Sequence, residues 1–542
     1  VPQTGGRGGR GGRGAAGGGD VVPPADEGPP GRGAGGGRGA AAATGPLPNG
    51  LAMGSGTLTI TQAVPTVSAT STAPGQRVTI NGAEAVAQVN ANGNLTGITI
   101  TNPGVSGGGG GPGTATINGN TVPIQTKVMA WDRAEPNQWD AYQDFGHSHF
   151  RNSFIWGENL HDVSILGPGL IDGSALVTNA NANTATANKT LALKECRNVT
   201  LRDFAFLRGG HFCILANAVD NFTIDNVKFD TNRDAADIVS CKNVRMSNCY
   251  VNSPNDDGIC LKADFALGKA RPCENVTITN CQVSGYGVGT LLDGTFDRST
   301  TRAPDGDGPT GRIKFGTESN GGFKNITISN CVFDHCRGLA MEAVDGGVIE
   351  DVTVTNLTMR EIFNSPIYIR LGQRQRGPEG TPMAQIRRIN ISNISAQALN
   401  PNLPVLISGV QDHPIEDLSI SNVRIVYPGG GTAQQAAIVV PERERQDYPE
   451  PSRLGVMPSS AFFVRHVKNL EMHHIDVTFK EADARPLMSL IDVAGADFQH
   501  MKMQRFEAVP YFSLSKVTDF STQYVRGVAD LKKDQAEGTI DK

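Results

Sequence analysis

From residue 160 onward, short stretches of alternating apolar and polar residues recur along the chain. Each stretch opens on polar residues, often Asn or Asp, and then alternates apolar residues with Thr or Ser, as in 197–202 and 274–279. Strict alternation is typical of a β-strand with one buried face. The first apolar position of each stretch lies at Val163, Val199, Phe222, Val244, Val276, Ile326, Val352, Ile389, Leu418 and Leu470.

The spacing of these positions indicates a repeat architecture. The shortest interval is 22 residues, from Phe222 to Val244, and the longer intervals are this unit with inserted loops. Leucine-rich repeats have a similar period but need a Leu-x-x-Leu-x-Leu frame, which is absent, and propeller blades need about 40–50 residues with four strands. The pattern therefore predicts an all-β fold, a right-handed parallel β-helix over residues 126–525, followed by a C-terminal tail over 526–542.

The N-terminal part of the chain has a different composition. Residues 1–50 contain 19 of the 66 glycines and five arginines, with few apolar side chains, so we expect a disordered tail. In residues 51–125 only Arg77 and Glu84 are charged, and Thr, Val and Ile alternate with small polar residues. This predicts a small β-rich module or an insertion into the main domain.

Charge and hydropathy exclude several functions. The net charge of −5 gives no electrostatic case for a nucleic-acid partner, and no run of about 18 apolar residues would span a membrane. The chain begins with Val1, which fits either a removed signal peptide or a trimmed chain, and we expect a secreted or periplasmic protein. Its oligomeric state does not follow from the sequence.

The nine cysteines all lie between residues 196 and 336. Cys249, Cys281 and Cys331 follow the same frame and should lie in register on successive coils. An interior ladder of small buried thiols is the interpretation that we favour, although one or two disulfides remain open in an oxidising compartment.

One group of acidic residues also falls into register. Asp234 follows its anchor Phe222 by 12 residues, and Asp256 follows its anchor Val244 by 12, so the two carboxylates should stack on adjacent coils. Asp237 and Asp257 lie close to them in the sequence. Stacked carboxylates repel, which separates their pKa values, as general acid and base work on a glycosidic bond requires. The alternative is a ladder of turn residues.

At these residues the chain resembles family 28 glycoside hydrolases, the polygalacturonase-like enzymes, as a divergent bacterial-type member. That family carries Asn-Thr-Asp, Asp-Asp, Gly-His-Gly and Arg-Ile-Lys motifs. Asn232-Arg233-Asp234 matches the first with Arg for Thr, and Asn255-Asp256-Asp257 matches the second. The resemblance implies inverting hydrolysis, with Asp256 as general acid and with Asp234 and Asp257 activating water.

The other two motifs depart from the family pattern. Counting back from the following strand, 311–322 occupies the coil of Gly-His-Gly, with Gly311 in place of His, with Arg312 and Lys314 beside it and with Glu318 further on. Alternatively Tyr286, within 285–287, replaces the His. The position of the Arg-Ile-Lys motif falls in the next coil, at 338–342. There Ala340 stands in place of the Arg and Glu342 in place of the Lys.

The loss of the Arg and Lys of the Arg-Ile-Lys motif affects which substrate we expect. The resemblance implies that they grip a uronate carboxylate, which Glu342 would repel, while Arg312 and Lys314 could supply positive charge from the coil before. We therefore expect weak or no activity on unmodified polygalacturonate, and a poly- or oligosaccharide substrate of the pectin type. Loop insertions favour exo action.

Aromatic and histidine residues complete the candidate cleft. All three tryptophans lie within 131–156, and Trp156 could belong either to a sugar-stacking platform or to a cap over the open end of the solenoid. His147 and His149 are expected on one strand face, where we expect substrate hydrogen bonding or a structural role from His149. His211, one turn before Asp234, could line the groove. A third metal ligand cannot be located, so no metal or cofactor is expected.

Two other functions compete with hydrolysis. A polysaccharide lyase shares the solenoid and typically uses a basic residue, a role open to Arg312 and Lys314. A non-catalytic glycan-binding β-helix would fit the Gly-rich tail and the β module.

Overall fold

The computed structural model describes the backbone of seven strands between residues 51 and 126, and residues 134–174, 176, 187–445 and 448–541. The predicted disordered tail, residues 1–50, lies outside this part of the chain. The seven strands form one sheet in the order β1-β2-β6-β7-β5-β4-β3. They are β1 (Leu51–Gly54), β2 (Thr57–Ile60), β3 (Arg77–Ile80), β4 (Ala83–Val89), β5 (Leu95–Asn102), β6 (Thr114–Ile117) and β7 (Asn120–Thr126).

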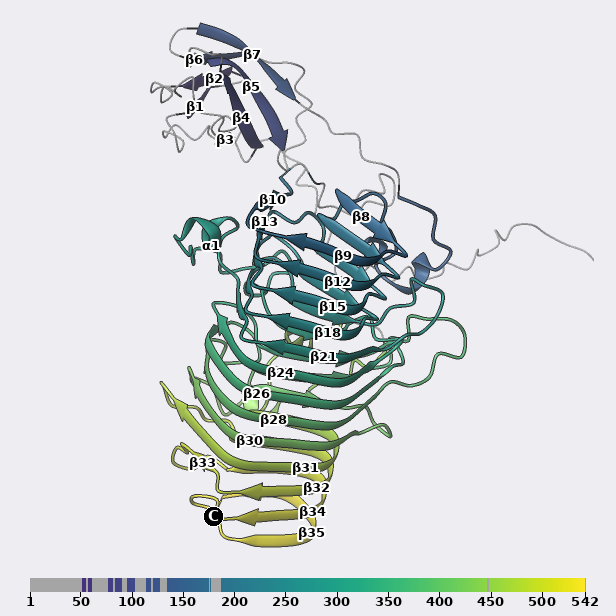
Figure 1. Ribbon diagram of the computed structural model, residues 1–542. Coiled ribbons are helices and arrows are strands. Elements are labelled where there is room, and N and C mark those ends of the chain that lie inside the picture. Colours follow the sequence, from purple (N-terminus) through teal and green to yellow (C-terminus); the bar gives the residue numbers. More distant parts are fainter. Residues whose placement is uncertain are drawn as a thin grey trace, which may run out of the picture.

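From residue 155 onward, the chain winds into a parallel β-helix. Twenty-eight strands form one continuous sheet, in which nearly every strand pairs in parallel with the strand one coil further along the chain. Figure 1 shows one face of this stack, where β9, β12, β15 and their successors lie one above the other. The all-β parallel β-helix expected from the repeat is confirmed.

The early coils contain three short strands each, and the later coils merge two of them. The first half comprises β8 (Ile155–Glu158), β9 (His161–Leu166), β10 (Leu170–Asp172), β11 (Leu191–Lys194), β12 (Arg197–Arg202), β13 (Ala205–Leu207), β14 (Ile214–Asn217), β15 (Asp220–Asp225), β16 (Lys228–Asp230), β17 (Ala236–Val239), β18 (Lys242–Ser247), β19 (Tyr250–Asn252), β20 (Ile259–Lys262), β21 (Cys273–Thr279) and β22 (Gln282–Ser284). The second half comprises β23 (Ile313–Phe315), β24 (Phe323–Asp334), β25 (Leu339–Ala343), β26 (Val348–Ile362), β27 (Ile367–Leu371), β28 (Gln385–Ala398), β29 (Val405–Ser408), β30 (Ile415–Tyr427), β31 (Phe462–Phe479), β32 (Met488–Gln499), β33 (Lys502–Met503), β34 (Phe512–Gln523) and β35 (Leu531–Ile540).

Helical segments are short and lie outside the stack. They are η1 (Asp140–Tyr142), η2 (Phe145–His147), α1 (Thr290–Asp293), η3 (Gln435–Ala437) and η4 (Pro451–Leu454). None of the helices in the described part of the chain has the length and apolar character needed to cross a membrane.

The repeat anchors form a single row through the core. Val163 pairs with Val199, Val199 with Phe222, and the row continues without a break to Leu470. Beyond Val163, every anchor is at most 1% exposed. Alternation therefore places this row of anchors inside, while the residues next to each anchor along the strand point outward.

The cysteines occupy the interior as expected. All nine are free and buried, and the structure describes each of them. Cys281 lies level with Cys331, because the paired residues on both sides of them are in register, and Cys249 lies level with them one coil before. The favoured thiol ladder is confirmed, because a thiol fills the same small core position on successive coils.

The C-terminal end differs from the expected tail. Residues 531–540 form β35, which pairs antiparallel with β34. Ala536 and Ile540 of this strand are buried against the last coil. The strand therefore covers the edge that a stack of parallel strands would otherwise leave open. The segment is short and polar, so its sequence did not predict a strand.

Candidate active site

Two neighbouring loops bring three aspartates together. Asp234 lies between β16 and β17, and Asp256 and Asp257 lie one coil later, between β19 and β20. One carboxylate oxygen of each lies within 4.8 Å of the other two. The backbone N–H of Asp257 donates to Asp234 Oδ1 at 2.9 Å and to Asp256 Oδ1 at 3.0 Å. Asp234 and Asp257 are buried, whereas Asp256 is partly exposed.

The register of this cluster differs from the expected one. Asp230 pairs with Asn252 and Ala236 pairs with Ile259, so the first loop has six residue steps and the second has seven. The extra residue places Asp257 level with Asp234, and Asp256 one position earlier. The expected stacking of Asp234 on Asp256 is therefore wrong, because a count from the previous strand cannot detect a one-residue change in a later loop.

Two cations hold Asp257 in its charged form. Arg312 Nε donates to Asp257 Oδ1 at 2.7 Å, and Lys314 Nζ lies 3.1 Å from Asp257 Oδ2. Burial alone would raise the pKa of this carboxyl, but the charges of Arg312 and Lys314 outweigh it and hold the pKa below its ordinary value. Asp257 is thus a carboxylate at neutral pH.

Asp234 has the opposite electrostatic environment. Its side chain is 1% exposed, and the nearest cation is Lys262, whose Nζ lies 3.8 Å from Oδ2. Burial, followed by the charges of Asp256 and Asp237, raises the pKa of Asp234 well above its ordinary value. In the protein without substrate, Asp234 therefore keeps its proton to higher pH than Asp257 does.

Asp256 is paired with the arginine that replaces the family threonine. Arg233 Nη2 lies 2.9 Å and Nε 3.2 Å from Asp256 Oδ2, and both side chains are 15% exposed. Arg233 Nη1 also donates to His211 Nδ1 at 3.2 Å. The ring of His211 packs directly against Gly146. The contact is so close that a Cβ on Gly146 would lie 2.5 Å from the ring. This pair is the accessible part of the cluster.

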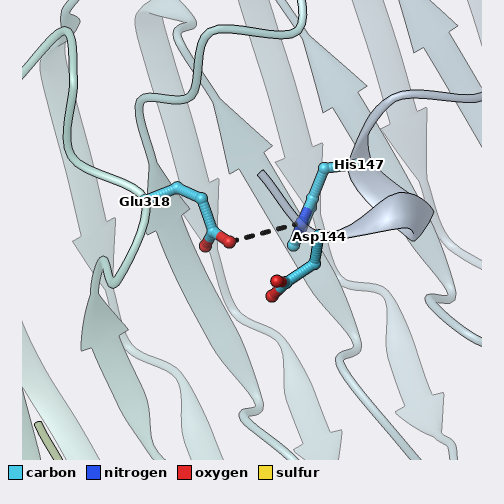
Figure 2. A group of neighbouring side chains, drawn as sticks. All are labelled: Asp144, His147 and Glu318. Carbon is cyan, nitrogen blue, oxygen red and sulfur yellow. Dashed lines mark ion pairs between the residues drawn. The ribbon is translucent and has the colours of Figure 1, made fainter. Parts of the chain in front are cut away.

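A second polar group lies buried beside the aspartates. His147 of η2 lies 3.8 Å from Asp237 Oδ2 and 3.8 Å from Glu318 Oε1. Lys262 Nζ stands among the carboxylates, 3.8 Å from Asp237 and 3.5 Å from Glu318. Figure 2 shows His147 and Glu318 facing one another, with Asp144 next to them. The side chains of His147, Asp237, Lys262 and Glu318 are all fully buried.

The loop between β27 and β28 adds a cation to this group. Arg376 Nη1 donates to Asp144 at 2.6 Å, and its Nη2 donates to Glu318. Asp144, His147 and Glu318 are close enough to share a metal ion, and so are His147, Asp234 and Asp237. Arg376 faces the first set and Lys262 the second, so protein cations already balance these carboxylates.

The predicted substrate-binding cations are not accessible. Arg312 is 2% exposed, while Lys314 and Glu342 are fully buried, with Lys314 Nζ 3.7 Å from Glu342. Glu450 from a distant loop completes the group, because both of its oxygens accept from Arg312. Burial, opposed by Lys314, raises the pKa of Glu342 to about 7. The expectation that Arg312, Lys314 and Glu342 contact substrate is corrected: Arg312 and Lys314 fix Asp257 and hold it charged, and Glu342 lies against Lys314.

The two candidate segments for the histidine position, 285–287 and 311–315, differ in what their side chains contact. Ile313 pairs with Ile259, and Lys314 pairs with both Cys260 and Ala340, so 311–315 occupies the coil next to the paired aspartates. Tyr286 follows β22, its hydroxyl donates to Asp334, and Arg298 stacks on its ring. Both segments belong to the loop between β22 and β23, and the segment beside the paired aspartates is that of Gly311, whose backbone N–H donates to the Asp256 carbonyl oxygen at 2.9 Å.

The remaining candidates separate into near and distant sets. Asn232 lies two residues before Asp234, half-buried beside the accessible pair. His149 does not lie on a strand: it follows η2, is buried, and contacts the Glu135 carbonyl oxygen and Asp140. Its substrate-binding role is corrected to a structural one, because both ring nitrogens face protein groups. Trp156 of β8 is 44% exposed, under Arg151, and lies three coils from Asp237 in the same strand register.

Sequence reasoning missed several members of the site. Lys262 carried a usable signal, since a lysine in an otherwise apolar strand five residues after Asp257 must find buried carboxylates. His147 was noted without its partners. Asp144, Arg376 and Glu450 arrive from loops more than 50 residues away from the carboxylates or cations that they meet, and no local pattern marks them.

The fold and the site together define a parallel β-helix with a three-carboxylate cluster on one face. Residues 119–291, which contain all three aspartates, match the family described as Glycosyl hydrolases family 28. Over these residues the chain is a family 28 glycoside hydrolase, and its relation to polygalacturonases is distant.

Individual relatives show how distant. A polygalacturonase of Cochliobolus carbonum is 24% identical over 197 residues, which is 35% of this chain and 46% of the relative, so the match spans about half of that protein. Among solved structures, the Thermotoga maritima exopolygalacturonase has a TM-score of 0.42 at 16% identity, covering 56% of this chain and 73% of that chain. The Erwinia carotovora polygalacturonase has a TM-score of 0.37 at 17% identity, covering 50% and 69%.

Proposed function

We propose that the protein hydrolyses glycosidic bonds in pectin-like polysaccharides or oligosaccharides. The observation that carries the proposal is the division of labour among three adjacent carboxyl groups. Asp257 is held ionised by two buried cations, Asp234 is buried with a raised pKa, and Asp256 is the accessible member. Carboxyl groups with pKa values pushed apart are what acid and base catalysis at one bond requires.

The roles follow from charge and access. Asp256, at the accessible edge, donates a proton to the glycosidic oxygen as that bond breaks. A water molecule held by Asp257 and Asp234 attacks the anomeric carbon from the opposite side and gives its proton to a carboxylate. The carboxyl group at Asp256 is reprotonated before the next cycle. This route inverts the anomeric configuration.

The stereochemistry has its own test. The closest oxygens of the three aspartates are within 4.8 Å, shorter than the separation of about 6.5–9.5 Å usual for inverting enzymes. The proposal of inversion therefore rests on the family resemblance. NMR of the first-formed anomer decides it, and retention of configuration would contradict the mechanism.

Segments on both sides of the cluster support exo action. Asp144 and His147 belong to the segment before β8, and Arg376 ties that segment to the coil of Glu318. On the other side, Tyr448 accepts from Lys314 and Glu450 accepts from Arg312. Because segments flank the aspartate cluster on both sides, the site suits the end of a polysaccharide chain better than its middle. We expect mono- or disaccharide from the start of the reaction, with slow loss of viscosity.

Uronate-containing chains are the substrate class that we propose. The expectation of weak activity on polygalacturonate relied on repulsion by Glu342. Because Glu342 is fully buried and lies 3.7 Å from the Lys314 ammonium, it does not face a bound sugar. Glu342 therefore does not repel a uronate carboxylate, and unmodified oligogalacturonates belong in the substrate panel beside neutral pectic oligosaccharides.

A lyase mechanism is less well supported by the same residues. It needs a basic group that is neutral and reaches a sugar carbon. Arg312 and Lys314 are buried, and although burial alone would lower their pKa values, the charges of Asp257, Glu450 and Glu342 raise them well above the ordinary range. Neither residue is thus free to remove a proton. Unsaturated products with ultraviolet absorbance would reinstate the lyase.

The central experiment compares wild type with Asp256→Asn on a panel of acidic and neutral pectic oligosaccharides. We expect the variant to lose most hydrolysis, by a factor of about 100 or more. Asp412→Asn is the matched control, because Asp412 is exposed on another coil and has a left-handed φ of 66° that Asn also adopts. Binding without turnover by wild type would favour the non-catalytic alternative.

A further inference from the structure

Arg233 is paired with Asp256, the partly exposed member of the aspartate cluster. Its guanidinium contacts a single oxygen of Asp256, Oδ2, while Asp256 Oδ1 accepts from the backbone N–H of Asp257. The backbone carbonyl of Arg233 is held by Ser253 Oγ at 2.8 Å. The main chain is therefore anchored, whereas the side chain is 15% exposed.

This contact conflicts with the role of Asp256. A general acid must carry a proton before it can donate one. A guanidinium at 2.9 Å favours the carboxylate form instead, and arginine itself never gives up its proton. While Arg233 stays on Asp256, the acid is not ready.

The pair is built so that it can be exchanged. Arg233 reaches Asp256 at one oxygen only, whereas a free carboxylate can accept two parallel N–H bonds from the guanidinium fork. A further partner, His211 Nδ1, is a neutral acceptor in this contact, because the arginine supplies the hydrogen. His211 cannot retreat, since its ring lies against Gly146. A uronate carboxylate is thus a better partner than Asp256.

We propose that Arg233 is a specificity-determining residue that leaves Asp256 to bind a uronate carboxylate of the substrate, and so readies Asp256 as the proton donor. This inference rests on the proposed function and names the charge that the substrate must carry. The proton comes from Asp234, whose carboxyl lies in the same 4.8 Å cluster. One proton moves from Asp234 to Asp256, which leaves Asp234 as a carboxylate that can act with Asp257 on water.

The device makes catalysis depend on substrate charge. A free uronate carboxylate takes Arg233 away from Asp256, so that Asp256 can be protonated and act as the acid. A methyl-esterified uronate has no negative charge, so Arg233 stays on Asp256 and the acid remains unprotonated at neutral pH. The ester should therefore be cleaved more slowly, and its activity should fall at lower pH than the activity on the free acid.

The test measures kcat and KM for trigalacturonate and its methyl ester across pH. We expect wild type to prefer the free acid, and Arg233→Ala to reduce the ratio of the two kcat/KM values about ten-fold or more. In Arg233→Ala, the alkaline limb for the ester should move to higher pH, since no cation then opposes protonation of Asp256. Arg233→Lys, which keeps the charge without the fork, should lie between. Arg245→Ala, an exposed arginine on β18, is the control.

Each outcome has a distinct meaning. Equal losses on both substrates, with an unmoved alkaline limb, would show that Arg233 is merely structural and would overturn the inference. An unchanged preference in Arg233→Ala would overturn it as well, while leaving the proposed hydrolysis intact. If wild type cleaves neither trimer, the proposed function fails for pectic uronates, and this inference falls with it.

Discussion

The Arg312 guanidinium meets the Glu450 carboxylate through two hydrogen bonds, of 3.0 Å and 2.8 Å, across 138 residues of sequence. Both side chains are buried, and Arg337 donates to the same carboxylate at 2.9 Å. Arg312 also holds Asp257. Glu450 therefore neutralises part of the positive charge that the fold gathers behind the base, and it links a loop near the C-terminal coils to the aspartate cluster.

We expect Glu450→Gln to destabilise the protein by about 3 kcal/mol or more, because two buried guanidinium groups lose their shared charge partner. Guanidinium-induced unfolding of wild type and variant measures this. Glu471→Gln, on the exposed face of β31, is the matched control and should change little. A variant as stable as wild type would show that the buried ion pair contributes no net stabilisation.

The same carboxylate should make stability depend on acidity. Burial would raise the pKa of Glu450, but Arg312 and Arg337 outweigh it and hold the pKa at about 2 in the folded protein. A group with a depressed folded pKa stabilises above its unfolded value of about 4.5 and loses that contribution as pH falls towards 2. Thermal unfolding between pH 6 and pH 2 should show this loss in wild type, with a shallower slope in Glu450→Gln. Parallel slopes would contradict it.

We expect Arg312→Met to lower activity by changing the ionisation of Asp257, the base. Without this cation, burial raises the pKa of Asp257, so a higher pH is needed to ionise the base. The acid limb of the pH–rate profile should move to higher pH, with kcat reduced about ten-fold or more. Arg245→Met is the control. An acid limb that stays in place would exclude Asp257 as the ionised base.

The sequence alone predicted the fold and part of the site because their causes are local. One apolar anchor per coil, from Val163 to Leu470, is enough to define parallel stacking, and the three aspartates lie within 25 residues. The stacking partner of Asp234 was wrong because one extra residue in the loop before Ile259 changes the register.

The charge environment could not be predicted in the same way. Whether Arg312 and Lys314 face substrate or face inward depends on a distant loop, from which Glu450 accepts from Arg312 across 138 residues and Tyr448 accepts from Lys314. Glu342 was expected to repel a sugar, yet it lies behind Lys314 in the interior. Loops that cover a solenoid carry no periodic signal, so their contacts become visible only in three dimensions.

Lys262→Met should lower both activity and stability. Lys262 Nζ is the cation nearest to Asp234, at 3.8 Å, and also lies among Asp237 and Glu318. Removing its charge leaves buried carboxylates facing one another, which costs about 3 kcal/mol or more and raises the pKa of Asp234 further. Lys228→Met, exposed on β16, is the control. Full activity in Lys262→Met would show that Asp234 needs no counter-charge.

The nine thiols should be unreactive in the folded protein. Burial raises the pKa values of Cys213, Cys241 and Cys260 well above the ordinary value, and all nine thiols are buried. Because the thiolate is the reactive form, a disulfide reagent such as Ellman's should titrate no thiols at pH 8 in buffer. In guanidinium, the same sample should release nine equivalents. Rapid reaction of one or more thiols without denaturant would show that the coils between Cys196 and Cys336 open locally, whereas fewer than nine in guanidinium would reveal a disulfide.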